Sequence, residues 1–77
     1  MTNEIAKPEP LDITSEQYRI YAYKDGGRYR INNPDRLYVL ESGSHRVIDG
    51  DGVVHRPERG WLAISWKPKA GAPEFVA

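Results

Sequence analysis

Arginine and tyrosine alternate along two short segments of this 77-residue chain, residues 18–23 and 28–31. A guanidinium beside aromatic rings suits cation–π contact and planar recognition of carboxylate or phosphate groups. The same residue types form platforms on which single-stranded nucleic acid stacks. They are also good strand residues, so a solvated sheet face that binds nothing stays open as a third interpretation.

The turn between these segments decides which side chains share a face of a sheet. We predict a two-residue turn at Gly26-Gly27, because two glycines tolerate the positive φ angles that it needs. A three-residue turn would mix the apolar and polar sets. The predicted register gives an apolar face with Ile20, Ala22, Tyr29 and Ile31, and a tyrosine–arginine face with Arg19, Tyr21, Tyr23, Arg28 and Arg30.

A tryptophan completes the predicted contact surface. Trp61 and Trp66 have opposite parity, so one face of a simple sheet does not bury both. We expect Trp66 to enter the core and Trp61 to lie at the rim, as a binding hot spot or packed against the C-terminal tail. The predicted binding residues are therefore Arg19, Tyr21, Tyr23, Arg28, Arg30 and Trp61.

Two histidines and two nearby aspartates are the candidate metal ligands. The segment 49–52 (Asp-Gly-Asp-Gly) lacks the third acidic ligand and the distant glutamate of a calcium loop, and a hairpin turn explains it. His45 and His55 share a face if a three-residue loop joins their strands, and lie on opposite faces if the loop has four residues. Their spacing matches no closed metal site, so we predict surface histidines, no metal and no cofactor.

The serine and glycine patterns offer little catalytic chemistry. Ser42, Ser44 and Ser65 stand outside any Gly-x-Ser-x-Gly elbow. Ser44 and His45 are sequence neighbours, so on a strand they point to opposite faces. No phosphate-binding glycine loop precedes a helix, and a core this small leaves little room for a deep pocket. We predict that the protein is not an enzyme.

Strand-forming residues separated by tight turns must position these side chains. Glycine, asparagine, aspartate and proline break the chain every few residues, and no helical period survives between the breaks. The sequence therefore predicts a mainly β fold, a small antiparallel meander of five to six short strands that forms a bent sheet or a small SH3-like open barrel. The expected strands are residues 17–24, 28–31, 36–41, 45–48, 53–56 and 61–66, and the expected core adds Leu37, Val39, Leu62, Ile64 and Trp66.

Both ends of the chain differ from its middle. Residues 1–15 contain Lys7-Pro8-Glu9-Pro10 and an excess of acidic residues, which predicts a flexible arm. Residues 16–67 form the expected β domain, and residues 68–77 a flexible tail. No apolar run suits a signal peptide or a membrane span.

Composition narrows the functional classes. Eleven basic residues balance eleven acidic ones, so net charge gives no general attraction to nucleic acid or anionic lipid. The chain has no cysteine, which excludes disulfides, thiolate metal sites and cysteine nucleophiles, and favours a reducing cytoplasm. A domain of this size is only marginally stable alone, so a protein partner or self-association is expected.

These features predict a small non-enzymatic, cytoplasmic protein-binding module, such as a regulator or inhibitor of a host protein. One alternative is a nucleic-acid-binding β domain that uses the same tyrosine–arginine face. Another is a structural subunit of an assembly such as a virion, with arms that lock neighbours together. In type, a short cysteine-free β domain with loose ends resembles the small accessory proteins of bacteriophages and other bacterial mobile elements, although no motif carries that resemblance.

Overall fold

Seven short β-strands make up the computed structural model, which describes residues 9–70. The mainly β class predicted from the sequence is confirmed. Across residues 9–70 there is no helix long and apolar enough to cross a membrane. The strands are β1 (Leu11–Asp12), β2 (Glu16–Ala22), β3 (Arg28–Asn32), β4 (Pro34–Val39), β5 (His45–Asp49), β6 (Val54–His55) and β7 (Ala63–Pro68).

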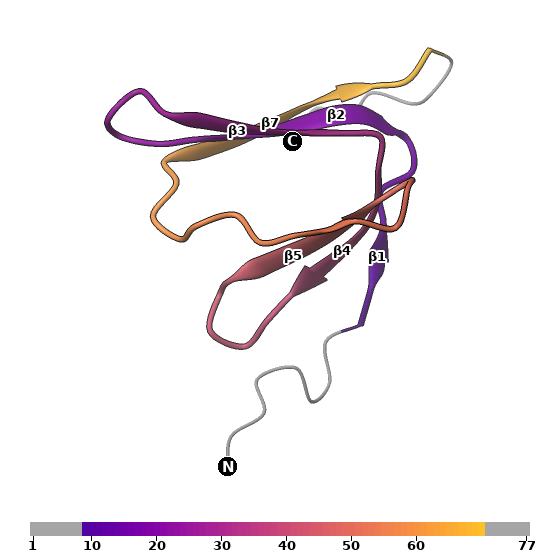
Figure 1. Cartoon of the computed structure of the whole chain (residues 1–77), viewed down its shortest axis with the longest axis horizontal. Coiled ribbons are helices and arrows are strands. Elements are labelled where there is room, and N and C mark those ends of the chain that lie inside the picture. The colour runs from indigo at the N-terminus through magenta and orange to yellow at the C-terminus, as the bar shows by residue number, and fades with distance from the viewer. Residues whose placement is uncertain (1–8, 71–77) are drawn as a thin grey trace.

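The strands divide between two antiparallel sheets that stack face to face (Figure 1). One sheet has the order β1-β4-β5-β6, and the other has the order β3-β2-β7. A single meander and an SH3-like barrel are not confirmed, because β7 returns to pair with β2 instead of continuing the sheet beyond β6. The segment that joins β6 to β7 runs along one open side of the stack (Figure 1).

Asn33 turns the chain from one sheet into the other, between β3 and β4. Its φ of 50° lies in the left-handed region, which asparagine adopts more readily than most residues. Its N–H donates to the Gln17 carbonyl at 2.9 Å, and its carbonyl accepts from the Gly50 N–H at 2.8 Å. One residue therefore anchors the crossover to both sheets.

All three hairpins close with a three-residue loop whose last residue is a glycine. The closing bonds run from Tyr23 to Gly27, from Leu40 to Ser44 and from Asp49 to Val53, each an N–H donating to a carbonyl. Gly26, Gly43 and Gly52 have φ values of 92°, 92° and 84°, the left-handed conformation that closes such a loop. The predicted two-residue turn at Gly26-Gly27 is therefore wrong, and the three-residue alternative for residues 50–52 is the one observed.

The loop at residues 24–26 changes which residues of β2 face the core. It pairs Tyr21 with Tyr29 and Ile20 with Arg30. Arg19 and Tyr21 consequently point inward with Ile31, and both are buried. The predicted faces were wrong for β2 but right for Arg28, Arg30 and Ile31 of β3.

The core lies between the sheets and contains Ile13, Tyr21, Ile31, Leu37 and Val47, with Tyr23, Trp61 and Ile64 packed against it. Three residues predicted for the core are exposed: Val39 by 43%, Leu62 by 71% and Trp66 by 49%. Val39 ends β4 beside a loop, and β7 is the outermost strand of its sheet, so no neighbouring strand covers Leu62 or Trp66. Ile20 and Ala22, also predicted for the core, are half-buried on the opposite face.

Part of the predicted N-terminal arm belongs to the fold. Leu11 and Asp12 pair with Leu37 and Arg36 of β4. Ile13 is buried in the core, and its N–H donates to the Asp35 carbonyl at 3.0 Å. From the predicted tail, Pro68 ends β7, and the Lys69 N–H donates to the Ser15 carbonyl at 2.8 Å. Residues 1–8 and 71–77 lie outside the described residues.

Two valines on neighbouring strands provide a matched test of this core. Val47 is fully buried, whereas Val39 is 43% exposed. We expect Val47→Ala to lower the free energy of unfolding by about 2 kcal/mol, and Val39→Ala to lower it by less than about 1 kcal/mol. Urea denaturation measures both, and the change in strand propensity is the same in the two variants. Equal losses would contradict this packing of the sheets.

Candidate functional site

A buried ion pair lies at the beginning of β2. The Nε and one terminal nitrogen of Arg19 donate to the two carboxylate oxygens of Glu16 at 2.9 and 2.8 Å. Both side chains are only 6% exposed. An irregularity in the pairing of β2 with β7, between Glu16 and Tyr18, places Glu16 on the same side as Arg19. Burial opposes the charged form of Arg19, but its bonds to Glu16 raise the pKa of the guanidinium above its ordinary value.

The ion pair continues into a bridge between the two sheets. Another terminal nitrogen of Arg19 lies 3.4 Å from the Tyr21 hydroxyl, which lies 2.7 Å from Nδ1 of His45 on β5. Arginine only donates, so the Tyr21 oxygen accepts from it and its proton is donated to Nδ1. Burial lowers the pKa of His45, and the positive charge of Arg19 lowers it further. The imidazole is therefore held neutral.

Trp61 covers this bridge instead of lying free at a rim. Its ring centroid is 4.9 Å from that of Tyr21 and 4.7 Å from that of His45. The rings of Tyr21 and Trp61 meet edge to face, an arrangement that aromatic pairs prefer. The alternation of β7 places Trp66 on the inner side with Ile64, as predicted, but Trp66 is half exposed, and Trp61 precedes β7 and so lies outside this alternation. Trp66 lies with its ring 5.2 Å from the Arg19 guanidinium.

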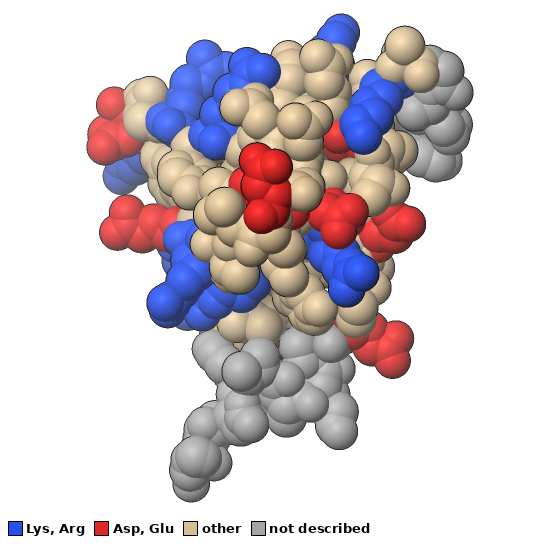
Figure 2. Space-filling model, turned by 45° about the vertical axis from the view of Figure 1, so that its right-hand side comes forward, with Lys and Arg blue, Asp and Glu red and all other residues tan. Residues whose placement is uncertain are grey.

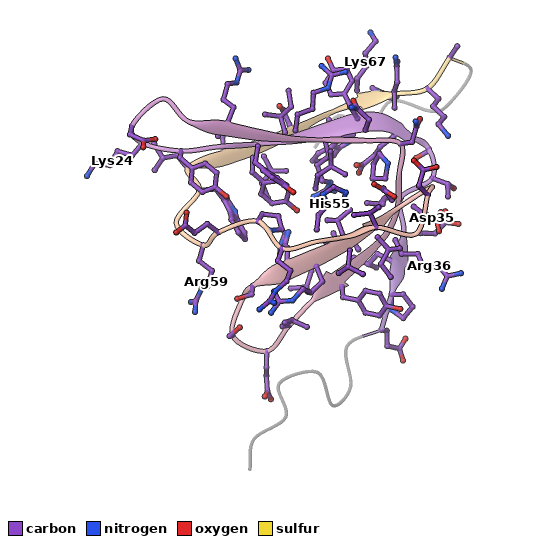
Figure 3. The ribbon with its side chains drawn as sticks, in the orientation of Figure 1. Lys24, Asp35, Arg36, His55, Arg59 and Lys67 are labelled. Atoms are coloured by element: carbon purple, nitrogen blue, oxygen red, sulfur yellow. The ribbon has the colours of Figure 1, made fainter. Side chains whose placement is uncertain are left out.

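A second bridge lies beside the first and involves the other histidine. The Tyr29 hydroxyl is 2.8 Å from Nδ1 of His55, and Nε2 of His55 is 2.8 Å from a carboxylate oxygen of Asp49. Because the Asp49 carboxylate accepts, Nε2 of His55 donates to it, and in the neutral imidazole Nδ1 accepts from the Tyr29 hydroxyl. The bond from His55 lowers the pKa of Asp49, and a backbone bond from Val53 adds to this effect. Figure 3 shows His55 in the space between the sheets.

The two bridges contain groups that could transfer protons, but they do not form a metal site. The order carboxylate, imidazole, hydroxyl in Asp49–His55–Tyr29 allows a proton to shift along the chain of bonds. Within residues 9–70, no group of three or more histidine, aspartate or glutamate side chains could hold a metal ion.

A groove of about 1000 Å³ opens between the β2–β3 hairpin and the segment 56–60. The Tyr23 side chain reaches across this groove, and its hydroxyl donates to the Glu58 carbonyl at 2.6 Å. Lys24 lies at the tip of the hairpin, and Arg59 lies on the facing segment (Figure 3). The groove is lined by the cations Lys24, Arg28 and Arg56, by the carboxylates Asp25 and Glu58, and by the rings of Tyr23 and Tyr29. Its mixed charges give it no strong preference for an anionic or a cationic ligand.

The outer face of the β3-β2-β7 sheet carries basic side chains and no acidic ones. Lys67 projects from this sheet away from the other one (Figure 3), and the strand registers place Arg28 and Arg30 on the same outer side. We call this surface the basic face. Its nine residues are Arg28, Arg30, Asn32, Tyr18, Ile20, Ala22, Ala63, Ser65 and Lys67, among which there is no carboxylate. On the side of the molecule that Figure 2 shows, acidic and basic side chains are interleaved.

The six residues predicted to bind a partner are therefore divided among three places. Arg30 lies on the basic face, and Arg28 lies on that face while also lining the groove. Tyr23 lines the groove. Arg19 and Tyr21 are buried and Trp61 packs on them, so these three serve the core. Tyr18 was missed because the wrong turn placed its side of β2 in the core, and Lys67 because the local sequence does not show that β7 pairs with β2.

The buried ion pair predicts a characteristic pattern of stability in variants. Arg19→Met leaves Glu16 buried without its partner and should lower the free energy of unfolding by about 3–5 kcal/mol. Adding Glu16→Leu removes the isolated carboxylate and should restore at least about 2 kcal/mol of this loss. Chemical denaturation of the three proteins measures the effect. A double variant as unstable as the single one would show that the charge of Glu16 is not the source of the loss.

The neutral state of His45 predicts a dependence of stability on pH. Its pKa in the folded protein lies below the ordinary value of 6.5, so the unfolded chain binds a proton first as the pH falls. The free energy of unfolding should therefore decrease as the pH is lowered from neutral through 6.5. His45→Gln should be less stable at neutral pH but show a shallower dependence over this interval. Denaturation curves with the same slope in both proteins would contradict the prediction.

Comparisons with known proteins add no family to this description. No protein-family model, curated protein or solved structure matches the chain. What the protein binds must therefore be inferred from its own surfaces. The basic face is the surface whose charge is all of one sign, and the groove adjoins it at Arg28.

Proposed function

We propose that this protein is a small non-enzymatic protein-binding module whose basic face binds an acidic segment of a partner protein. The observation that carries this proposal is the charge of the face: Arg28, Arg30 and Lys67 share it with no carboxylate. Complementary charge of this kind speeds association and selects between partners. The three small residues Ala22, Ala63 and Ser65 leave the middle of the face low enough for close approach.

Arg30 is held ready for such a contact. Its guanidinium lies 3.9 Å from the centre of the Tyr18 ring, and its Nε donates to the side-chain oxygen of Asn32 at 2.8 Å. A side chain already fixed in this way loses less conformational entropy when it binds. Its terminal nitrogens stay available for the paired hydrogen bonds that guanidinium forms with a carboxylate. Neither Arg28 nor Arg30 has an ion-pair partner among residues 9–70.

The same contact favours a protein partner over nucleic acid. Tyr18 is the one aromatic ring on the basic face, and the Arg30 guanidinium already stacks on it. A base that stacked on this side of the ring would first have to displace the guanidinium. The chain as a whole is electrically neutral, whereas nonspecific binders of nucleic acid usually offer many cations.

The polar bridge from Tyr29 through His55 to Asp49 supports a structural role and not a catalytic one. The hydroxyl of Tyr29 is held by His55, and His55 is held by Asp49, so the chain of bonds links β3 to the opposite sheet. We therefore treat the Asp49–His55–Tyr29 chain as a tie between sheets. The lack of cysteine is compatible with a reducing compartment, so we place the interaction in the cytoplasm. An accessory protein of a phage or mobile element that regulates a host protein would act in this way.

Charge reversal on the basic face tests the proposal. An oligoglutamate peptide should bind the protein at low ionic strength, and Arg30→Glu with Lys67→Glu should weaken this binding by about tenfold or more. Arg36→Glu with Arg59→Glu makes the same change in net charge at exposed sites elsewhere and should have little effect. Fluorescence titration measures the affinities, and circular dichroism confirms that each variant is folded. Equal weakening by the two double variants, or tighter binding of oligothymidylate than of oligoglutamate, would overturn the proposal.

A further inference from the structure

The outermost strand β7 leaves one of its edges without a partner in the part of the chain that the structure describes. It pairs with β2 on one side, and it is the last strand in the order β3-β2-β7. An open edge presents a row of backbone N–H and carbonyl groups that can pair with another strand. At six residues, β7 is long enough for several such bonds.

The first part of this edge is uncharged and largely apolar. Residues 62–66 (Leu-Ala-Ile-Ser-Trp) contain no charge, and Leu62 and Trp66 are largely exposed. The opposite edge of the same sheet is β3, which carries the charges of Arg28 and Arg30. Charged residues on an edge strand discourage pairing between molecules. In β7 the protecting residues, Lys67 and Pro68, come only at the end of the strand, so residues 62–66 are the stretch of edge fitted for a contact.

We propose that β7 is a docking edge for a second copy of this chain, which adds its own β7 antiparallel to form a continuous six-stranded sheet. The argument is the self-complementary pattern of residues 62–66, in which large apolar residues alternate with small ones. Centring the pair on Ile64 sets Leu62 opposite Trp66 of the second copy and Ala63 opposite Ser65. Large residues then meet on one side of the new sheet and small residues on the other.

Charge and stability both fit this register. Lys67 falls beyond the five paired residues, so the two lysines lie at opposite ends of the contact and do not face each other. The contact covers two exposed apolar side chains, Trp66 of β7 and Leu62, which directly precedes β7. A domain this small gains from covering such surface, because it buries little of it alone. The dimer would also set two basic faces side by side, but it rests on the edge of the sheet and not on the proposed acidic partner.

Mass measurement over a range of concentrations tests the dimer. The full chain should change from monomer to dimer between low micromolar and near-millimolar concentration in analytical ultracentrifugation. Trp66→Lys and Leu62→Lys should each weaken association by about tenfold or more, since a lysine would enter an apolar contact. Val53→Lys is the matched control, because Val53 is 51% exposed at a distant hairpin loop. A monomer throughout the range, or equal weakening by Val53→Lys, would overturn the proposal.

Single cysteines test the register, because the natural chain has none. Ile64→Cys places two identical residues directly opposite each other at a separation that a disulfide spans. Ser65→Cys moves each cysteine one residue off the centre, so the two thiols are no longer paired. Mild oxidation should therefore give several times more covalent dimer with Ile64→Cys than with Ser65→Cys on a nonreducing gel. Equal or reversed yields would exclude this register, whatever the outcome of the oligoglutamate titration.

Discussion

The arrangement of the two sheets depends on the hydrogen bonds of the Tyr21 hydroxyl. It accepts from Arg19 in its own strand and donates to His45 in the opposite sheet, while Trp61 covers the ring. A buried hydroxyl, imidazole and guanidinium are each costly unless all are paired, so the three groups constrain one another's positions. Every buried side-chain nitrogen and oxygen in residues 9–70 has a hydrogen-bond partner. The small apolar core is therefore held in one arrangement by polar bonds that a slipped register would break.

The sequence was sufficient to predict the class of fold but not the register of its first hairpin. Strand-forming residues between turn residues indicated a mainly β chain, and glycine marked each turn. The hairpin failed because both parities of β2 contain plausible core residues: Ile20 and Ala22 on one side, Tyr21 and Tyr23 on the other. The choice depends on His45, which is 24 positions away and offers the Tyr21 hydroxyl its acceptor. The shared position of glycine in all three loops is the local signal that would have given the correct three-residue loop.

The candidate surface was predicted in part for the same reason. Arg28 and Arg30 were assigned correctly to an outer face, because the alternation of β3 is unambiguous. Arg19 was not, since its burial needs Glu16, and Glu16 reaches it only through an irregular pairing with β7. Lys67 joins the basic face through the long-range pairing of β7 with β2. A contact between distant segments leaves no periodic trace in either of them, so these assignments require the tertiary structure.

The place of β7 in the chain also has a consequence for the order of folding. The β2–β3, β4–β5 and β5–β6 pairs join strands that are sequence neighbours, each closed by a loop of three residues. The pairing of β7 with β2 instead encloses all three hairpins, and closing so long a stretch of chain costs more entropy than closing a short loop. The hairpins are thus able to form early and locally, whereas β7 docks late. Until β7 docks, the β2–β3 hairpin lacks the strand that completes its sheet.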